Sequence, residues 1–393
     1  MFWFASLLSN IGSWAQMVAE PWLLLRLGAS PFLVGLDSFA LSMPVLLLTL
    51  AGGVLADRAD RRRVITLFQS LQMLCPIAIV ALLLTGGLAP WIVIALSLVV
   101  GITDALSMPA FTSIVPTIVE RPQLPAALAL NSTQFNLSRV LGPALAGVLM
   151  ASVGAIGCFA VSAVSYIPFI GVALWILPRQ PRSMTRVSAD ALRHPFAGLR
   201  GILEVPQLRG AILTTFFSGL LCGPLITFTP VLIKNVLQGD AGQYSLAVGA
   251  FGVGGVLGAG ALVGVEPGRD RRWLATIFGS AFGAALVLVA MNPSVRVLPG
   301  LMVLCGVAMS VTNTSTNTLL QSGAAPEQRG QAVSLFMLAM RGGLALGSLL
   351  TGALVNQWGV RHALLVDGLL AVGAQVVISW TWLRAAPATV QAD

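Results

Sequence analysis

Apolar runs long enough to cross a lipid bilayer recur along the whole chain. A transmembrane helix needs about 20 predominantly apolar residues, and 56% of the 393 residues are hydrophobic whereas 9% are charged. A soluble domain carries roughly 25% charged residues, which form its surface. This composition excludes a water-soluble globular protein and predicts an all-α polytopic membrane protein.

Twelve such runs are separated by short clusters of Arg, Pro, Gly or Asp. They cover residues 3–25, 33–56, 64–86, 90–114, 127–152, 155–177, 210–235, 243–265, 272–292, 297–321, 330–355 and 361–383. We expect 12 transmembrane helices in two pseudo-symmetric six-helix bundles, with 1–178 as the N-terminal bundle, 179–209 as a cytoplasmic linker, and 210–393 as the C-terminal bundle with a short cytoplasmic tail. Apolar residues three and four apart between 192 and 203 predict an amphipathic helix in the linker.

Basic residues concentrate in the loops on one side of the predicted membrane. Of the 22 Lys and Arg residues, 16 fall in the loops and tails on the side of both termini. Because cytoplasmic loops retain Lys and Arg, we expect a multi-pass protein of the cytoplasmic (inner) cell membrane with both termini in the cytoplasm. The Arg residues are spread over short loops, which argues against nucleic-acid binding.

An internal repeat relates the two predicted bundles. An offset of 205 residues places Gly142 on Gly347 and Gly147 on Gly352. The fifth and eleventh runs are therefore equivalent elements. Parallel halves of this kind are typical of alternating-access transporters, which hold the substrate near the bilayer midplane.

The loop after the second run carries a motif. Residues 53–63 read GVLADRADRRR and resemble the loop motif of the major facilitator superfamily, G-x-x-x-D-R-x-G-R-R/K. Gly53, Asp57, Arg58 and Arg61 match it, and Asp60 stands where a glycine is usual. The resemblance implies 12 helices and drug-proton or siderophore-proton antiport.

The fifth run carries a second motif. Residues 131–147, NSTQFNLSRVLGPALAG, include Gly142, Pro143 and Gly147 and look like the antiporter motif of exporter branches. Together with EQRG at 327–330, this resembles the branch that contains the enterobactin exporter and macrolide-efflux proteins.

The first motif also suggests a conformational latch. Asp57 ends the second run at the level where the eleventh helix begins, and a carboxylate near a helix N-terminus is favourable by about 0.3–1 kcal/mol. Gly53 would let the backbones approach. Glu266 takes the place of Asp57 in the second half when Arg63 is matched to Arg272. The alternative is a basic cluster that only sets topology.

Four charged residues lie well inside the predicted helices: Glu20, Asp104, Arg139 and Arg341. A charge that faces lipid there costs roughly 2.5–3.5 kcal/mol. We expect Asp104 to support the loop motif or Arg139. Arg341 would bind an anionic substrate or stabilise the interface between the halves. Asp37 and Asp367 lie near the outer ends of their runs.

Glu20 is the predicted proton-binding group. It shares a helix face with Asn10, Ser13 and Met17, as expected of a cavity wall. It would bind a proton or a cationic substrate. The alternative is a structural ion pair with Arg139.

Small and amide residues mark two further runs. Asn313 and Asn317 in the tenth run would face the cavity or else form interhelical hydrogen bonds. Six glycines between 249 and 260 predict close backbone approach of the eighth run against a helix of the other half.

Nothing in the chain indicates enzyme chemistry, so no catalytic residues are expected. There is no phosphate-binding P-loop, Lys234 is the only lysine, and the two histidines lack zinc spacing. We expect no metal and no cofactor. The expected partners are a small-molecule substrate, protons and the lipid bilayer, and the protein is expected to be a monomer that exports. An uptake symporter or facilitator and a non-transporting membrane sensor remain alternatives.

Overall fold

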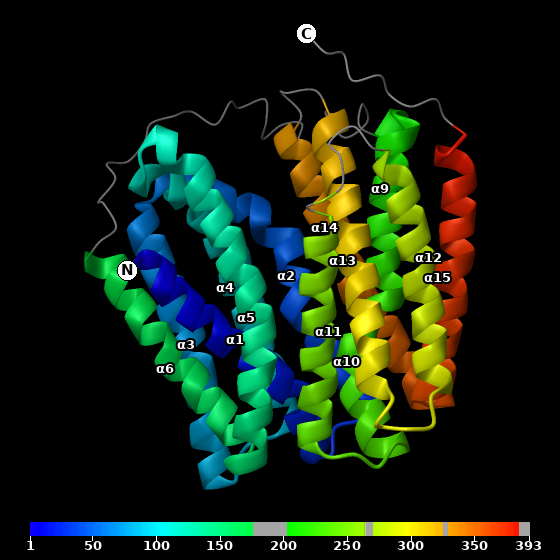
Figure 1. The fold of residues 1–393 in the computed structure, drawn as a ribbon. Coiled ribbons are helices and arrows are strands. Elements are labelled where there is room, and N and C mark those ends of the chain that lie inside the picture. The colour runs from blue at the N-terminus through cyan, green and yellow to red at the C-terminus, as the bar shows by residue number, and fades with distance from the viewer. Residues whose placement is uncertain (176–202, 263, 265–269, 325–328, 385–393) are drawn as a thin grey trace. The chain divides into compact units, whose positions relative to one another are not determined.

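The computed structural model describes residues 1–175, 203–262, 264, 270–324 and 329–384, and the regular elements within them are all helices (Figure 1). The first half holds α1 (Phe2–Arg26), α2 (Pro31–Arg58), α3 (Arg61–Thr85), α4 (Pro90–Ile118), the short turn η1 (Arg121–Gln123), α5 (Leu124–Ser152) and α6 (Ala155–Trp175). The second half holds α9 (Pro206–Phe217), η2 (Ser218–Cys222), α10 (Pro224–Val231), η3 (Leu232–Val236), α11 (Ala241–Ala261), α12 (Arg271–Met291), α13 (Leu298–Gly323), α14 (Arg329–Trp358) and α15 (Val360–Trp382).

The helices begin and end close to the predicted bounds. The difference is four residues or fewer, as at the end of α4, which was predicted at 114 and lies at Ile118. Local signals set several starts. Ser30 caps α2 by accepting from the backbone N–H of Leu33 at 3.4 Å, and Pro31 occupies the first turn, where its missing N–H costs nothing.

Ten helical segments in the described part of the chain are long and apolar enough to cross a membrane, with Pro206–Val236 counted as one segment. α1 and α5 have 25 and 29 residues but do not belong to that set. The all-helical membrane architecture is therefore confirmed, and the count of 12 spans stays a prediction.

The chain divides into two compact units. One comprises residues 1–189 with 239–249, and the other comprises 190–238 with 250–393. The first residues of α11 thus group with the first unit. The predicted bundle bounds stay a prediction, and the amphipathic helix predicted for the linker falls almost wholly outside the described residues.

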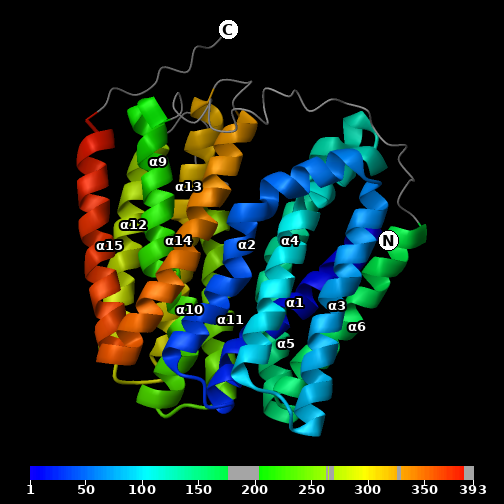
Figure 2. The ribbon, with the colours of Figure 1, turned by 180° about the vertical axis from the view of Figure 1, so that it is seen from behind.

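Glycines bring helix backbones together in the first unit. α2 and α4 run side by side in both views (Figures 1 and 2). A Cβ on Gly101 would lie 2.4 Å from the Leu41 carbonyl oxygen, and one on Gly52 would lie 2.5 Å from that of Ala105. No side chain fits at such distances, so these glycines hold α2 against α4. A Cβ on Gly53 meets nothing within 4 Å, so Gly52 and not Gly53 packs α2 on α4, and the approach of Gly53 to the eleventh span stays a prediction.

Close approach recurs in the second unit, but not where the sequence placed it. The glycine-rich face of α11 packs on α13 of the same half: a Cβ on Gly254 would lie 2.1 Å from the Val303 carbonyl oxygen, and one on Gly258 2.7 Å from that of Val307. The expectation that this face meets the other half is wrong for these two glycines. Each glycine fits because it presents no side chain to the facing backbone.

The helix from α9 to η3 is irregular. Two π-helical turns, η2 and η3, flank α10, which starts at Pro224 and contains Pro230. Proline lacks a backbone N–H and interrupts the regular hydrogen-bond ladder, and isolated π turns occur frequently at functional sites. The two irregular turns of this segment thus lie on either side of its prolines.

Candidate functional site

Glu20 lies in the last third of α1 and is buried, with 9% of its surface exposed. The hydroxyl of Ser97, from α4, donates a hydrogen bond of 2.5 Å to its Oε1 atom. Gln16, one turn earlier on α1, also interacts with the Glu20 carboxyl group. The contacts of Glu20 are therefore neutral polar groups, and within the described residues no ion pair joins it to Arg139.

A second acid, Asp37 of α2, belongs to the same site. It is 6% exposed, and its carboxyl group is within interaction range of the Ser97 hydroxyl and of the Glu20 charge. Its Oδ1 atom has no hydrogen-bond partner among the described residues. We call Glu20 and Asp37 the carboxyl pair.

When both acids are ionised, the carboxyl pair has too few hydrogen-bond donors. The Ser97 hydroxyl has one hydrogen, and its Oγ atom is within hydrogen-bond distance of Glu20 Oε1 at 2.5 Å and of the Val93 carbonyl oxygen at 3.1 Å. An ionised Asp37 would remain buried without a full set of donors, whereas a protonated Asp37 can itself donate. Two like charges so close cannot both ionise cheaply. The geometry suits one proton held between two acids.

The pairing of Asp37 with Glu20 could have been predicted from the depth of each residue in its helix. Glu20 lies six residues before the end of α1 at Arg26, and Asp37 lies six residues after the start of α2 at Pro31. Two helices joined by a tight turn place such residues at equal depth, about 9 Å into the helices. Ser97 could not be found this way because many serines occur in spans.

Further polar groups follow α1 on the side that meets α5 and α6. Asn10 Nδ2 donates to Gln134 Oε1 at 3.2 Å, and the Ser13 and Tyr166 hydroxyls lie 3.2 Å apart. Met17 is 40% exposed. Asn10 and Ser13 of the predicted stripe thus make hydrogen bonds to two different helices, and a cavity wall along this face stays a prediction.

Arg139 and Asp104 are both partly buried. The Arg139 guanidinium lies over the Trp14 ring, 5.5 Å from its centroid, as in a cation–π contact. Gly142 makes room for this arrangement, since a Cβ there would lie 2.3 Å from Trp14. Asp104 is close enough to Tyr166 for its charge to act on the phenol. The structure thus places Arg139 against an aromatic ring.

Two further residues of the motif at 131–147 pack against their surroundings. Pro143 is buried. A Cβ on Gly147 would lie 3.1 Å from the Ser245 Cβ atom at the start of α11.

The predicted latch is only partly described. The side chains of Asp57 and Arg58 and the whole of Glu266 lie outside what the structure describes. Asp60 does have a local role: it caps α3, which begins at Arg61, by accepting from the Arg62 N–H at 3.0 Å. This cap explains why an aspartate suits a position where the resembling motif has glycine.

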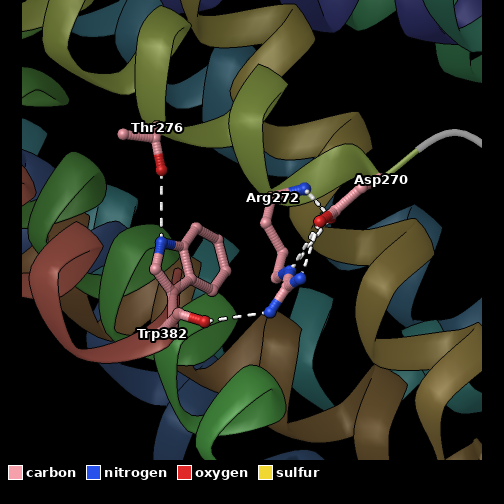
Figure 3. A network of polar contacts seen from close by, with 4 residues as sticks. All are labelled: Asp270, Arg272, Thr276 and Trp382. Carbon is pink, nitrogen blue, oxygen red and sulfur yellow. Dashed lines mark hydrogen bonds and ion pairs between the residues drawn. The ribbon is translucent and has the colours of Figure 1, made fainter. Parts of the chain in front are cut away.

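The second half repeats that cap and extends it into a network (Figure 3). Asp270 caps α12 and also binds the Arg272 guanidinium, with Nη2 to Oδ2 at 2.7 Å. Arg272 Nη1 donates to the Trp382 carbonyl at 3.0 Å, and the Trp382 indole donates to Thr276 Oγ1 at 3.2 Å. We call these four residues the Arg272 network.

Hydrogen bonding from Arg272 lowers the pKa of Asp270 from its ordinary value. The caps also align the two loops, because Asp60 and Asp270 occupy the same helical position. This register differs by one residue from the match of Arg63 to Arg272 that pointed to Glu266.

The amide-rich run of α13 divides between two faces. Thr316 is buried and accepts a hydrogen bond of 3.0 Å from Thr215 of α9, so hydroxyl groups form the packing seam. Asn313 and Asn317 are partly buried, and Asn317 accepts from Gln321 at 3.0 Å. Arg341 of α14 is partly buried as well. These three side chains are not brought together by any described contact.

Comparison with known proteins settles the family. A model of the family of transmembrane secretion effectors matches residues 1–392. The chain belongs to this family. It is therefore a membrane-embedded transporter of small molecules from the major facilitator superfamily, and its relatives are transporters and not enzymes.

Several transporters match this chain over nearly its whole length. The staphyloferrin A transporter of Staphylococcus aureus is 25% identical over 376 residues, which are 94% of this chain and 93% of the relative. The multidrug efflux pump Tap of Mycolicibacterium fortuitum is 26% identical over 378 residues, 93% and 91% of the two chains. Macrolide efflux protein A of Streptococcus pyogenes is 21% identical over 383 residues, 95% and 93%.

Solved transporter structures share the fold of this chain. A POT family transporter in complex with 5-aminolevulinic acid has a TM-score of 0.77 at 12% identity, covering 98% of this chain and 95% of that one. A bacterial homologue of the human lysosomal transporter Spinster, in an inward-facing and occupied conformation, has a TM-score of 0.71 at 18% identity, covering 98% and 97%. At such identities the likeness confirms the fold alone.

Proposed function

We propose that this protein exports a small amphipathic molecule in exchange for protons. The observation that carries the proposal is the carboxyl pair: two buried acids, Glu20 and Asp37, share the surroundings of one hydroxyl and form no ion pair within the described residues. Intramembrane acids of this kind are typical of proton relays. The names of two relatives, a multidrug efflux pump and a macrolide efflux protein, support export, and that of the third supports a siderophore as one class of cargo.

The carboxyl pair would couple the proton gradient to the conformational cycle. Proton binding removes one of two neighbouring charges, so it favours a closed, dry environment, and proton release favours a hydrated one. Each pH unit across the membrane supplies about 1.4 kcal/mol per proton. An alternating-access cycle that exposes the pair to each side in turn would use this energy to move substrate.

Other predicted residues enter the proposal as substrate contacts and switches. Arg139 with Trp14, together with Arg341, Asn313 and Asn317, are the candidates for substrate binding. We place both termini in the cytoplasm and assign latch roles to Asp57 with Arg58 and to Glu266. A monomer suffices for this mechanism.

Transport into inverted membrane vesicles tests the proposal. Ethidium, an amphipathic cation, serves as a fluorescent probe, with an acidic vesicle interior as the driving force. The wild type is expected to accumulate ethidium only while the pH gradient lasts. Glu20→Gln, which keeps the shape of the acid and removes its charge, is expected to lower this flux at least tenfold.

Asp240→Asn is the matched control. Asp240 is an exposed acid, its carboxylate accepts from the Gln243 N–H at 2.8 Å, and asparagine can form the same cap. This variant is expected to transport like the wild type. Wild-type accumulation that ignores the pH gradient would refute proton coupling, and lower accumulation in vesicles with the protein than in vesicles without it would indicate the opposite direction, uptake by the cell.

A further inference from the structure

The second unit contains a buried acid of its own. Asp367 of α15 is 3% exposed, and the hydroxyl of Thr351, from α14, donates to its Oδ2 atom at 2.7 Å. Thr351 lies seven residues before the end of α14 at Trp358, and Asp367 lies seven residues after the start of α15 at Val360. The two residues are therefore at equal depth in consecutive helices, as Glu20 and Asp37 are in α1 and α2.

The cations on the helices around Asp367 are engaged elsewhere or distant along their helix. α15 packs against α12, α14, α9, η2 and α10. Arg361, six residues before Asp367, donates to the Asn292 carbonyl at 2.9 Å. Arg272 belongs to the Arg272 network, which binds the far end of α15 at Trp382. Arg341 precedes Thr351 by ten residues, about 15 Å along α14.

The remaining titratable groups near Asp367 add no positive charge beside it. Cys222 of η2 is buried and close enough to be affected by the Asp367 charge. His362 is exposed, and its Nδ1 atom lies 2.9 Å from the Trp358 carbonyl oxygen. Arg209 of α9 is exposed near the first turn of its helix. Within the described residues, Asp367 forms no ion pair.

We propose that Asp367, held by Thr351, is a second proton-binding site of this transporter. A buried acid with one hydroxyl donor and no cation is stable when neutral, because a neutral carboxyl group needs fewer donors than a carboxylate. It can take up a proton at its free oxygen while Oδ2 keeps the bond from Thr351. The inference rests on the proposed function in one respect only: it assigns a second proton to the same transport cycle.

The position of Thr351 connects this site to an irregular helix. α14 contacts the α9–η2 segment backbone to backbone: a Cβ on Gly343 would lie 2.4 Å from the Phe216 carbonyl oxygen, and one on Gly347 2.0 Å from that of Leu220. Cys222, at the end of η2, neighbours Asp367. Charging or neutralising Asp367 therefore changes the electrostatics beside a π-helical turn.

Infrared difference spectroscopy of the purified full-length protein tests the site without any substrate. Spectra at acidic and alkaline pH are subtracted, and the C=O stretch of protonated carboxyl groups is compared between variants. Asp367→Asn is expected to remove one component of this band, and Asp240→Asn is expected to leave the buried components unchanged. Thr351→Val keeps the acid but removes its donor, so it is expected to shift the same component to higher frequency.

Two outcomes would overturn the proposal. A band of Asp367→Asn identical to that of the wild type would show that Asp367 does not titrate. An unshifted component in Thr351→Val would show that the hydroxyl does not hold a neutral acid. The band reports on protonation whether or not ethidium transport responds to a pH gradient, so a failure here is distinct from a failure of the proposed function.

Discussion

Two sites of the chain use acidic side chains in different ways. In the first half, Glu20 and Asp37 are buried inside helices with neutral partners. In the second half, Asp270 lies at a helix start, partly exposed, and binds Arg272, which in turn binds the end of another helix. One arrangement leaves charge available for titration, and the other uses charge to join helix ends.

The difference shows how environment decides the role of an acid. A carboxylate that caps a helix and binds arginine gains charge-assisted hydrogen bonds and stays ionised. A carboxylate inside a membrane helix without a cation is costly when ionised and is retained only where it has a function. The predictions below test this division, from the largest expected effect to the smallest.

The largest effect is expected from the carboxyl pair. Glu20→Gln and Asp37→Asn are each expected to lower ethidium flux driven by a pH gradient at least tenfold. Because both acids serve one proton, the double variant is expected to be no slower than the slower single variant. Initial rates in inverted vesicles give the comparison, and multiplied losses in the double variant would show that the acids act independently.

Next comes the Arg272 network. Arg272→Ala removes the ion pair to Asp270 and the bond to the Trp382 carbonyl, and hydrogen bonds of charged groups contribute roughly 1.5–3 kcal/mol. We expect the free energy of unfolding to fall by about 2 kcal/mol, seen as a lower midpoint in denaturant titrations of the purified protein. Arg271→Ala is the neighbouring control, and an equal loss there would contradict a specific network.

A smaller effect is expected where α2 meets α4. Gly101 packs against Leu41. Gly101 lies one turn after Ser97 on α4, and Leu41 lies one turn after Asp37 on α2. Gly101→Ala forces the helices apart, at a cost of about 1 kcal/mol from overpacking, and is expected to lower ethidium flux several-fold. Gly171→Ala in α6, where a Cβ meets nothing within 4 Å, should lower neither the free energy of unfolding nor the flux. Equal behaviour of the two variants would contradict the packing account.

The smallest effect is expected on the stability of the protein at low pH. The pKa of Asp270 lies below its ordinary value because of Arg272, so its contribution to stability is complete above the ordinary value of about 3.9 and is lost as the pH falls through the lowered value. Asp270→Asn is expected to reduce the fall of the thermal unfolding midpoint as the pH is lowered through this range. Because the carboxylate is partly exposed, the loss should be under about 1 kcal/mol. An unchanged fall of the midpoint would contradict the role of the pair.

Much of the fold could be predicted from the sequence. Apolar runs set helix positions because each span must satisfy its own backbone in lipid, and the bounds came within four residues, as for α4. Helix rotation could not be predicted. Glycines occur on several faces of α11, so their spacing did not reveal that Gly254 and Gly258 meet α13.

The candidate site was predictable in part. A single acid in the first span was enough to identify Glu20, since intramembrane charge is rare. Its contacts also involve α2 and α4, and Ser97 of α4 lies 77 residues away along the chain. The sequence therefore offered Arg139 as a partner, whereas the structure gives Ser97 and Asp37.

The central claim, that the carboxyl pair couples protons to transport, is tested most directly by separating exchange from coupling. Proteoliposomes loaded with unlabelled ethidium and placed in labelled ethidium measure exchange without a pH gradient. Glu20→Gln and Asp37→Asn are expected to exchange at rates near that of the wild type and to lose the response to an imposed pH gradient. Variants that keep the wild-type response to the gradient would contradict the claim.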